Sequence, residues 1–210
     1  MYRQFIENVV LPLGDKALGT SFIRSLRGIR KLSGKSEVEL NALQERKLHD
    51  LLVFASTSSE YYKSMGIESN IDSYQWLREF PILNKQDIRN HTDKILAVDK
   101  GSLVERKSSG SSGNQTTVYL SKNEISIHRA YQTYWWELAG YTIGDPILQT
   151  GMTMQRGIVK KIKDLLFRTY YMPAFVPTDE DFRRAFSWLG RKKNVFVGGY
   201  ASSLYVIAEN

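Results

Sequence analysis

The chain has 210 residues, 42% hydrophobic and 24% charged, with 15 Gly, 5 Pro and no Cys, a composition that excludes disordered and collagen-like chains. The absence of cysteine excludes disulfide frameworks, thiolate zinc sites and thiol nucleophiles, and it agrees with a cytoplasmic location. Lys and Arg number 29 against 22 Asp and Glu, and this surplus of positive charge attracts anions without selecting among nucleotide, nucleic acid and acidic lipid.

The first hundred residues are predicted to be helical, because apolar residues recur at helical spacing. The apolar run at residues 9–11 is broken by Pro12 and is too short for a signal segment or a membrane span. Ser36 and Glu39 have the spacing of a capping box, and Asn84 is predicted to cap a helix that runs to about residue 95. One apolar stripe is predicted after the first cap, formed by Leu40, Leu43, Leu48, Leu51, Leu52 and Ala55.

After residue 100 the pattern changes to short β-rich runs. Residues 103–106 and 116–120 flank a loop rich in Gly and Ser, which predicts a hairpin. Helical and β-rich runs then alternate, which favours a parallel sheet with crossover helices. The predicted order is helix 124–139, strand 146–150, helix 158–168, extended segment 172–176, helix 180–189, strand 195–197 and a helix that starts at Ser202. The predicted fold class is therefore α/β, with a helical amino-terminal lead-in followed by a largely parallel sheet.

The loop at residues 108–113, SSGSSG, is the most informative segment for function. Glycines let backbone N–H groups turn toward one point, and hydroxyls add further donors, so such a loop can hold phosphate oxygens. It is not a Walker loop, because the terminal Gly-Lys-Ser/Thr is missing and a strand is predicted to follow it. The residue pattern alone leaves two interpretations open, a phosphate-binding loop and an inert turn.

The segment 108–121, SSGSSGNQTTVYLS, resembles the phosphate-binding loop of adenylate-forming enzymes, within the phenylacetate-CoA ligase and CapK-like capsular polysaccharide biosynthesis branch. Three further segments resemble motifs of that branch in the family's order. They are FPILNK at 80–85, AGYTIGD at 139–145 and GYASSL at 199–204. The chain departs from the pattern where Gln115 replaces a frequent Pro, Thr116 stands at a position that is Lys or Thr in relatives, and Ala201 replaces a Pro.

The resemblance implies an ATP-dependent ligase that converts a small carboxylic acid to an acyl-adenylate and passes the acyl group to CoA or another acceptor, with Mg²⁺ on the phosphates. Residues 101–210 would then be a partial α/β nucleotide-binding subdomain that follows a helical region at 1–100. No residue matches the family's catalytic lysine or its downstream metal motif, so no catalytic residue and no metal ligand are assigned. The ATP phosphates would be held by Ser108, Ser109, Gly110, Ser111, Ser112, Gly113 and Thr116.

Only the amino-terminal half of such an enzyme is matched, so a second function is kept open. The alternative is a non-catalytic truncated homologue that acts as a binding or interaction module. A half-domain leaves sheet edges and apolar faces uncovered, and either a homodimer or a missing carboxy-terminal half would cover them.

Acyl-pocket residues are expected in the loops that follow the parallel strands, where open α/β sheets bind ligands. The alternative is that Gly199 only permits a turn and that Ser202 caps the last helix. The candidate substrate-binding residues are Gly151, Met152, Thr153, Gly199, Tyr200 and Ser202.

Other functions are less well supported by the sequence. The three histidines, His49, His91 and His128, are far apart, and neither a metal site nor a hydrolase triad is expected from them. Residues 131–138 are interpreted as a packed aromatic helix face that includes Tyr131, Trp135 and Leu138, and nucleic acid is not an expected partner. Residues 23–30 and 158–166 are basic and amphipathic, but ordinary packing of the apolar face explains them without a membrane surface.

Overall fold

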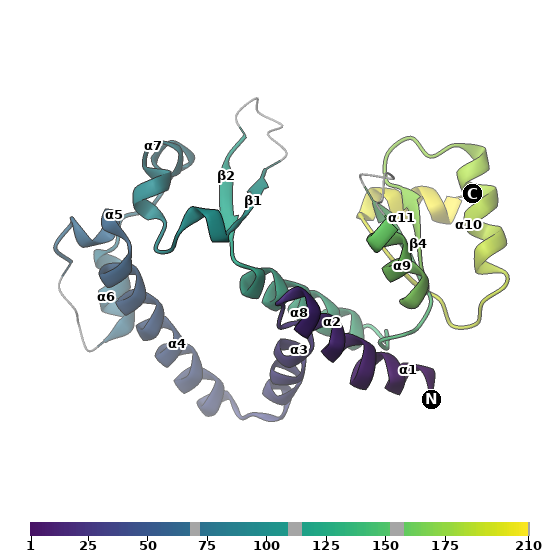
Figure 1. Ribbon diagram of the computed structural model, residues 1–210, viewed down its shortest axis with the longest axis horizontal. Helices are drawn as coiled ribbons and strands as arrows, with labels where there is room; N and C mark the ends of the chain where they lie inside the picture. The colour runs from purple at the N-terminus through teal and green to yellow at the C-terminus, as the bar shows by residue number, and fades with distance from the viewer. Residues whose placement is uncertain (68–71, 109–114, 152–157, 210) are drawn as a thin grey trace. The chain divides into compact units, whose positions relative to one another are not determined.

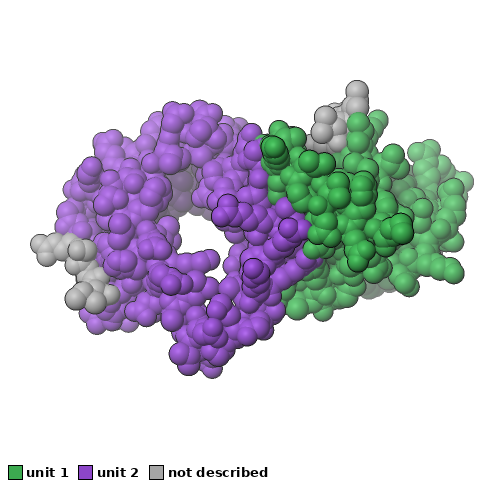
Figure 2. Space-filling model, turned by 60° about the horizontal axis from the view of Figure 1, so that its bottom comes forward, with its two compact units in different colours: residues 1–18, 132–210 green, residues 19–131 purple. Residues whose placement is uncertain are grey.

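The computed structural model describes residues 1–67, 72–108, 115–151 and 158–209. The chain divides into two compact units, shown in Figure 2. We call Gly19–Tyr131 the helical unit, and Met1–Leu18 together with Gln132–Asn210 the sheet unit. The boundary falls inside helix α8 (Lys122–Leu138).

The helical unit is built mainly from helices, and the starts of α4 (Glu37–Ser58) and α7 (Lys85–Ile95) are capped as the sequence predicts. The Ser36 Oγ accepts a hydrogen bond from the Glu39 N–H, and the Glu39 carboxylate accepts one from the Ser36 N–H at 2.9 Å. Asn84 and Asp87 form a second capping box. The helical elements are α3 (Phe22–Arg30), the 3₁₀ turn η2 (Lys31–Gly34), α4 (Glu37–Ser58), α5 (Glu60–Lys63), α6 (Ser73–Glu79), α7 (Lys85–Ile95) and the 3₁₀ turn η3 (Lys100–Ser102).

The predicted stripe on α4 is only partly correct. Leu52 is buried and Leu48 is half-buried, whereas Leu40 and Leu51 are exposed. Successive residues on a helix are rotated by about 100°, so Leu51 points away from the face that carries Leu52. That face packs against α5 and α6. The ring of the buried Trp76 on α6 lies beside that of His49 on α4, with the ring centroids 5.6 Å apart.

The predicted hairpin is confirmed. Strands β1 (Val104–Lys107) and β2 (Thr117–Leu120) pair antiparallel, with Val104 opposite Leu120 and Lys107 opposite Thr117. Both strands, which are labelled in Figure 1, belong to the helical unit.

The sheet unit contains three parallel strands, which confirms the predicted α/β fold. β3 (Ile147–Gly151) is central, between β4 (Thr169–Pro173) and β5 (Phe196–Gly198). Crossover helix α9 (Ile158–Leu166) joins β3 to β4, and α10 (Asp179–Leu189) joins β4 to β5. The unit also contains α1 (Tyr2–Phe5), the π-helical turn η1 (Ile6–Val10), α2 (Leu11–Leu18) and the last helix α11 (Ala201–Glu209).

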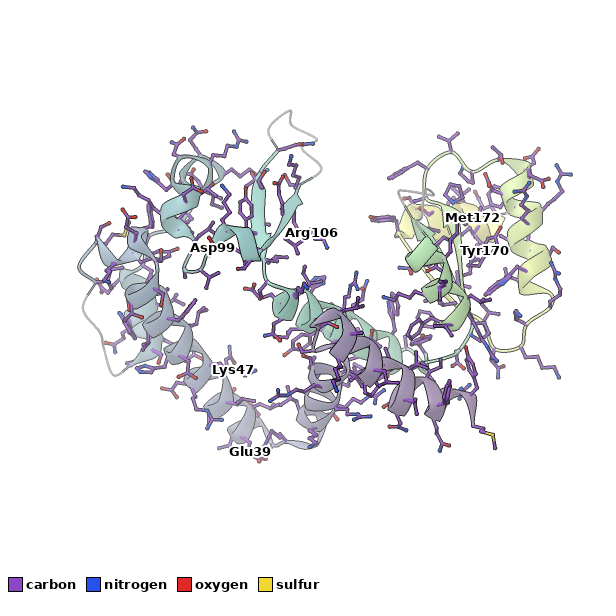
Figure 3. The ribbon with its side chains drawn as sticks, viewed as in Figure 1. Glu39, Lys47, Asp99, Arg106, Tyr170 and Met172 are labelled. Atoms are coloured by element: carbon purple, nitrogen blue, oxygen red, sulfur yellow. The ribbon has the colours of Figure 1, made fainter. Side chains whose placement is uncertain are left out.

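The core of the sheet unit lies between the sheet and α10. Leu148 of β3, Met172 of β4 and Ala185 of α10 are fully buried and are surrounded by larger side chains such as Tyr170 and Trp188. Figure 3 labels Tyr170 and Met172 on β4. Burial of side chains the size of Leu148 and Met172 stabilises the unit by about 2 kcal/mol each.

The packed face predicted for α8 is wrong in part. Trp135 is 62% exposed and Leu138 is 69% exposed. The side chain that packs is the neighbouring Trp136, whose ring centroid lies 5.9 Å from those of Tyr141 and Phe196. Helical spacing identifies candidate faces, and tertiary contacts decide which of two adjacent tryptophans is covered.

Candidate functional site

The two ends of the Ser- and Gly-rich loop are joined at the open end of the hairpin. The Ser108 N–H donates to the Thr116 backbone carbonyl at 2.9 Å, and the Thr116 N–H donates to the Ser108 Oγ at 2.9 Å. The first bond continues the backbone ladder of β1 and β2 by one step, and the second adds a side-chain bond where the loop leaves and re-enters the hairpin. The other predicted phosphate-binding residues lie outside the described residues: Ser109, Gly110, Ser111, Ser112 and Gly113.

The Thr116 hydroxyl is the feature of this region that fits an anionic ligand. Thr116 is 8% exposed, and its Oγ1 is buried with no hydrogen-bond partner among the described residues. An unsatisfied buried hydroxyl costs about 1–3 kcal/mol, so it is usually explained by a ligand, water or ion. The Ser108 Oγ, which accepts from the Thr116 N–H, still has its hydroxyl hydrogen to donate.

Positively charged side chains lie on the β1–β2 hairpin and next to it. Arg106 and Lys107 are exposed at the end of β1, and Figure 3 marks Arg106 there. Lys107 pairs with Glu105 at 3.0 Å, and Lys100 pairs with Asp93 at 2.8 Å and lies over the Tyr119 ring. The carboxylates raise the pKa of both lysines, so these groups stay protonated at neutral pH. Positive charge next to the loop would attract phosphate groups.

The carboxyl ends of β3 and β5 meet through Thr150 and Gly199. The Tyr200 N–H donates to the Thr150 Oγ1 at 3.2 Å, and a Cβ on Gly199 would lie 2.1 Å from the same oxygen. Gly199 is therefore required by close approach and not only by a turn. Gly151 is joined to the end of β4, because its carbonyl accepts from the Ala174 N–H at 2.9 Å.

A small apolar pocket of about 210 Å³ opens between the end of β4 and α11. Ser202 lines it, and Tyr200 stacks on the lining residue Phe175, with ring centroids 6.2 Å apart. Ser202 lies in the first turn of α11 and does not cap it, because the helix begins at Ala201. The remaining lining residues are Met172, Pro173, Ala174, Val176, Pro177, Ser203, Val206 and Ile207.

The structure therefore brings together part of the predicted acyl pocket. Gly151, Gly199, Tyr200 and Ser202 lie at the carboxyl edge of the three strands, while Met152 and Thr153 are outside the described residues. Sequence reasoning missed Phe175 and Val176 as pocket residues. Val176 has φ 49°, which is rare for a β-branched residue, and such strain is found mainly at functional sites.

The AGYTIGD segment at residues 139–145 precedes β3 and fixes the position where that strand begins. Asp145 is buried, accepts from the Thr142 N–H at 3.0 Å and forms an ion pair with Arg3. Gly144, with φ 91°, lets the chain turn beside Arg3. Burial, assisted by the Asp145 charge, raises the pKa of Tyr141 to about 12 against an opposing hydrogen bond from the Gly144 backbone. These residues position the strand, and none of them is among the described residues that line the pocket.

Two of the three histidines, His49 and His91, contact neighbouring side chains of the helical unit. The His49 Nδ1 is 3.4 Å from the Ser73 Oγ, and the His91 ring is 5.2 Å from that of Tyr61. In the parts of the chain that the structure describes, no three His, Asp or Glu side chains gather in a way that would hold a metal ion, and no helix is long and apolar enough to cross a membrane.

Comparison with known proteins gives one informative match. No family model matches the sequence. The chain is similar to Protein CapK of Staphylococcus aureus. The two are 24% identical over 182 residues, which cover 81% of this chain and 40% of CapK. The chain thus spans less than half the length of CapK. The similarity supports a CapK-like relationship and no more than that.

Proposed function

We propose that this chain provides the ATP-phosphate loop and part of the acyl pocket of an adenylate-forming ligase that acts in capsular or surface polysaccharide biosynthesis. The observation that carries the proposal is the buried Thr116 hydroxyl at the base of a Ser- and Gly-rich loop, which has no hydrogen-bond partner in the part of the chain that the structure describes. The similarity to CapK and the order of the four motifs add to it.

The proposed reaction is an acyl activation. A carboxylate oxygen of the acid attacks the α-phosphorus of ATP, the bond between that phosphorus and the oxygen bridging to the β-phosphorus breaks, and pyrophosphate leaves. The hydroxyls of Ser108 and Thr116 donate to phosphate oxygens and stabilise the charge that builds on the leaving group. Bound Mg²⁺ would neutralise part of that charge, and we assign it no protein ligand in this chain. CoA or another acceptor then attacks the acyl carbon of the acyl-adenylate, the bond from that carbon to the phosphate oxygen breaks, and AMP leaves.

The acid would bind at the carboxyl edge of the parallel sheet. The pocket beside α11 is mainly apolar, with Phe175 and Tyr200 stacked and the Ser202 hydroxyl nearby. This composition suits the apolar part of a small carboxylic acid. No catalytic residue is assigned, because the sequence has no match to the family's lysine.

Replacing Thr116 by valine tests the proposal. Valine keeps the shape and removes the hydroxyl, so Mg·ATP affinity measured by calorimetric titration should fall about 10-fold, the worth of one hydrogen bond to a charged group. The stability of the ATP-free protein should stay the same or rise by about 1 kcal/mol, because an unsatisfied buried hydroxyl is removed.

Thr116→Ser is the matched control, since it keeps the hydroxyl and should keep most of the affinity. Equal ATP affinity for the wild type and Thr116→Val would contradict the loop assignment. ATP binding without pyrophosphate release, in the longest native polypeptide that carries this sequence, would favour the alternative of a non-catalytic binding module.

A further inference from the structure

Helix α9 presents three apolar side chains of its carboxyl-terminal half to solvent. Ile162 is 55% exposed, Leu165 is 80% exposed and Leu166 is 37% exposed. This corrects the sequence-based interpretation that these residues pack onto the sheet. Helix α3 has a similar sequence pattern, yet its Ile23, Leu26 and Ile29 are buried. The apolar face of α3 is therefore packed inside the protein, whereas Ile162 and Leu165 of α9 are exposed to solvent.

The exposure of α9 is not explained by a loosely attached helix. The Tyr2 hydroxyl donates to the Leu166 carbonyl, and the Arg168 guanidinium lies 4.0 Å from the centroid of the Tyr2 ring. The Arg168 carbonyl also accepts from the Ile147 N–H at 3.1 Å, which ties the end of α9 to β3. The helix is held at its carboxyl end, while Ile162 and Leu165 face outward.

The charges of α9 identify what can cover this face. The nine residues of the helix contain three lysines, Lys160, Lys161 and Lys163, and a single carboxylate, the half-buried Asp164. Lys161 and Lys163 are exposed and lie next in sequence to Ile162. An apolar row bordered by lysines is the pattern of a helix that lies in the interface of an anionic bilayer. A second copy is disfavoured, because pairing two such faces would bring their lysines together.

We propose that α9 is a peripheral membrane-binding helix, which places Ile162 and Leu165 in the acyl-chain boundary of an anionic bilayer and Lys161 and Lys163 at the headgroups. The proposal is independent of the ATP-binding function. It assigns the exposed apolar face of α9 to one occupant, an anionic lipid surface, and requires no membrane-spanning segment.

Vesicle sedimentation of the full chain tests this inference. The wild type should sediment with vesicles of phosphatidylglycerol and phosphatidylcholine at low salt, and weakly with phosphatidylcholine alone. The double variant Ile162→Ser with Leu165→Ser should reduce the partition coefficient at least about 10-fold, because it removes several methylenes from the buried face. Lys161→Gln with Lys163→Gln should reduce it for anionic vesicles and remove its salt dependence.

The matched control is Val38→Ser, which changes a 78% exposed aliphatic residue on α4 and should leave vesicle binding unchanged. Circular dichroism of each variant separates loss of binding from loss of folding. Failure of the folded wild type to sediment with anionic vesicles would overturn the proposal. Equal binding by the Ile162→Ser, Leu165→Ser variant would do so too, as would light scattering that shows this variant converting a dimer to a monomer with vesicle binding unchanged.

Discussion

Gly199→Ala is expected to destabilise the protein by about 3 kcal/mol, the upper part of the range for overpacking a well-packed site. The new Cβ would lie 2.1 Å from the Oγ1 of Thr150 and 3.0 Å from its Cβ. Thr150 is 5% exposed on the central strand and cannot move without disturbing its pairing with β4. The Tyr200 N–H bond to Thr150 would be lost as well. Urea-induced unfolding measures the effect as a lower midpoint.

Gly198→Ala is the control for that substitution. Its Cβ would meet the Phe196 ring at 3.5 Å, an ordinary contact, so the unfolding midpoint should change little. Adding Thr150→Ala to Gly199→Ala removes the colliding hydroxyl and should restore part of the lost stability. A Gly199→Ala protein as stable as the wild type would show that β3 and β5 do not approach as described.

Gly110→Val combined with Gly113→Val is expected to lower pyrophosphate release with a cognate acid by at least about 100-fold, the typical cost of losing positioned donors in a transition state. Both residues lie outside the described residues, so this prediction rests on the sequence pattern and on the resemblance. Glycine allows backbone conformations that turn N–H groups toward a phosphate, and valine disfavours them. Release is measured in the longest native polypeptide that carries the sequence.

The control for the loop variant is Gly34→Val, at a position where an added Cβ meets nothing within 4 Å. It should leave pyrophosphate release unchanged. If the loop variant remained fully active and folded, the loop would not hold the leaving group, and the inert-turn interpretation of residues 108–113 would be favoured.

Local sequence signals predicted the secondary structure well. Capping boxes at Ser36 and Asn84 fix helix starts through bonds between residues three apart, so the sequence contains all the information required. The order of strands and helices after residue 100 was predictable because β-rich and helical runs differ in spacing. Tertiary contacts were not predictable in the same way, and the exposed Trp135 and Leu165 show this.

In the candidate site too, the residues next to a strand end could be predicted from the sequence, whereas those placed by tertiary contacts could not. Gly199 and Tyr200 could be predicted, because a parallel strand ends just before them and ligands bind at that edge. Phe175 and Val176 carry no motif, and their place in the pocket depends on α11 lying across the end of β4. The Thr116 hydroxyl, which lacks a hydrogen-bond partner among the described residues, could be recognised only once the burial of its oxygen was known.

Titration of the ¹⁵N-labelled chain with Mg·ATP, followed by amide chemical shifts, tests the central claim most directly. We expect saturable shifts at Ser108, Thr116 and the residues between them, with α6 unaffected, and the Thr116→Val variant should need about 10-fold more ATP. No shift at millimolar ATP, or shifts confined to residues far from the hairpin in sequence, would contradict the assignment of residues 108–116 as a phosphate-binding loop.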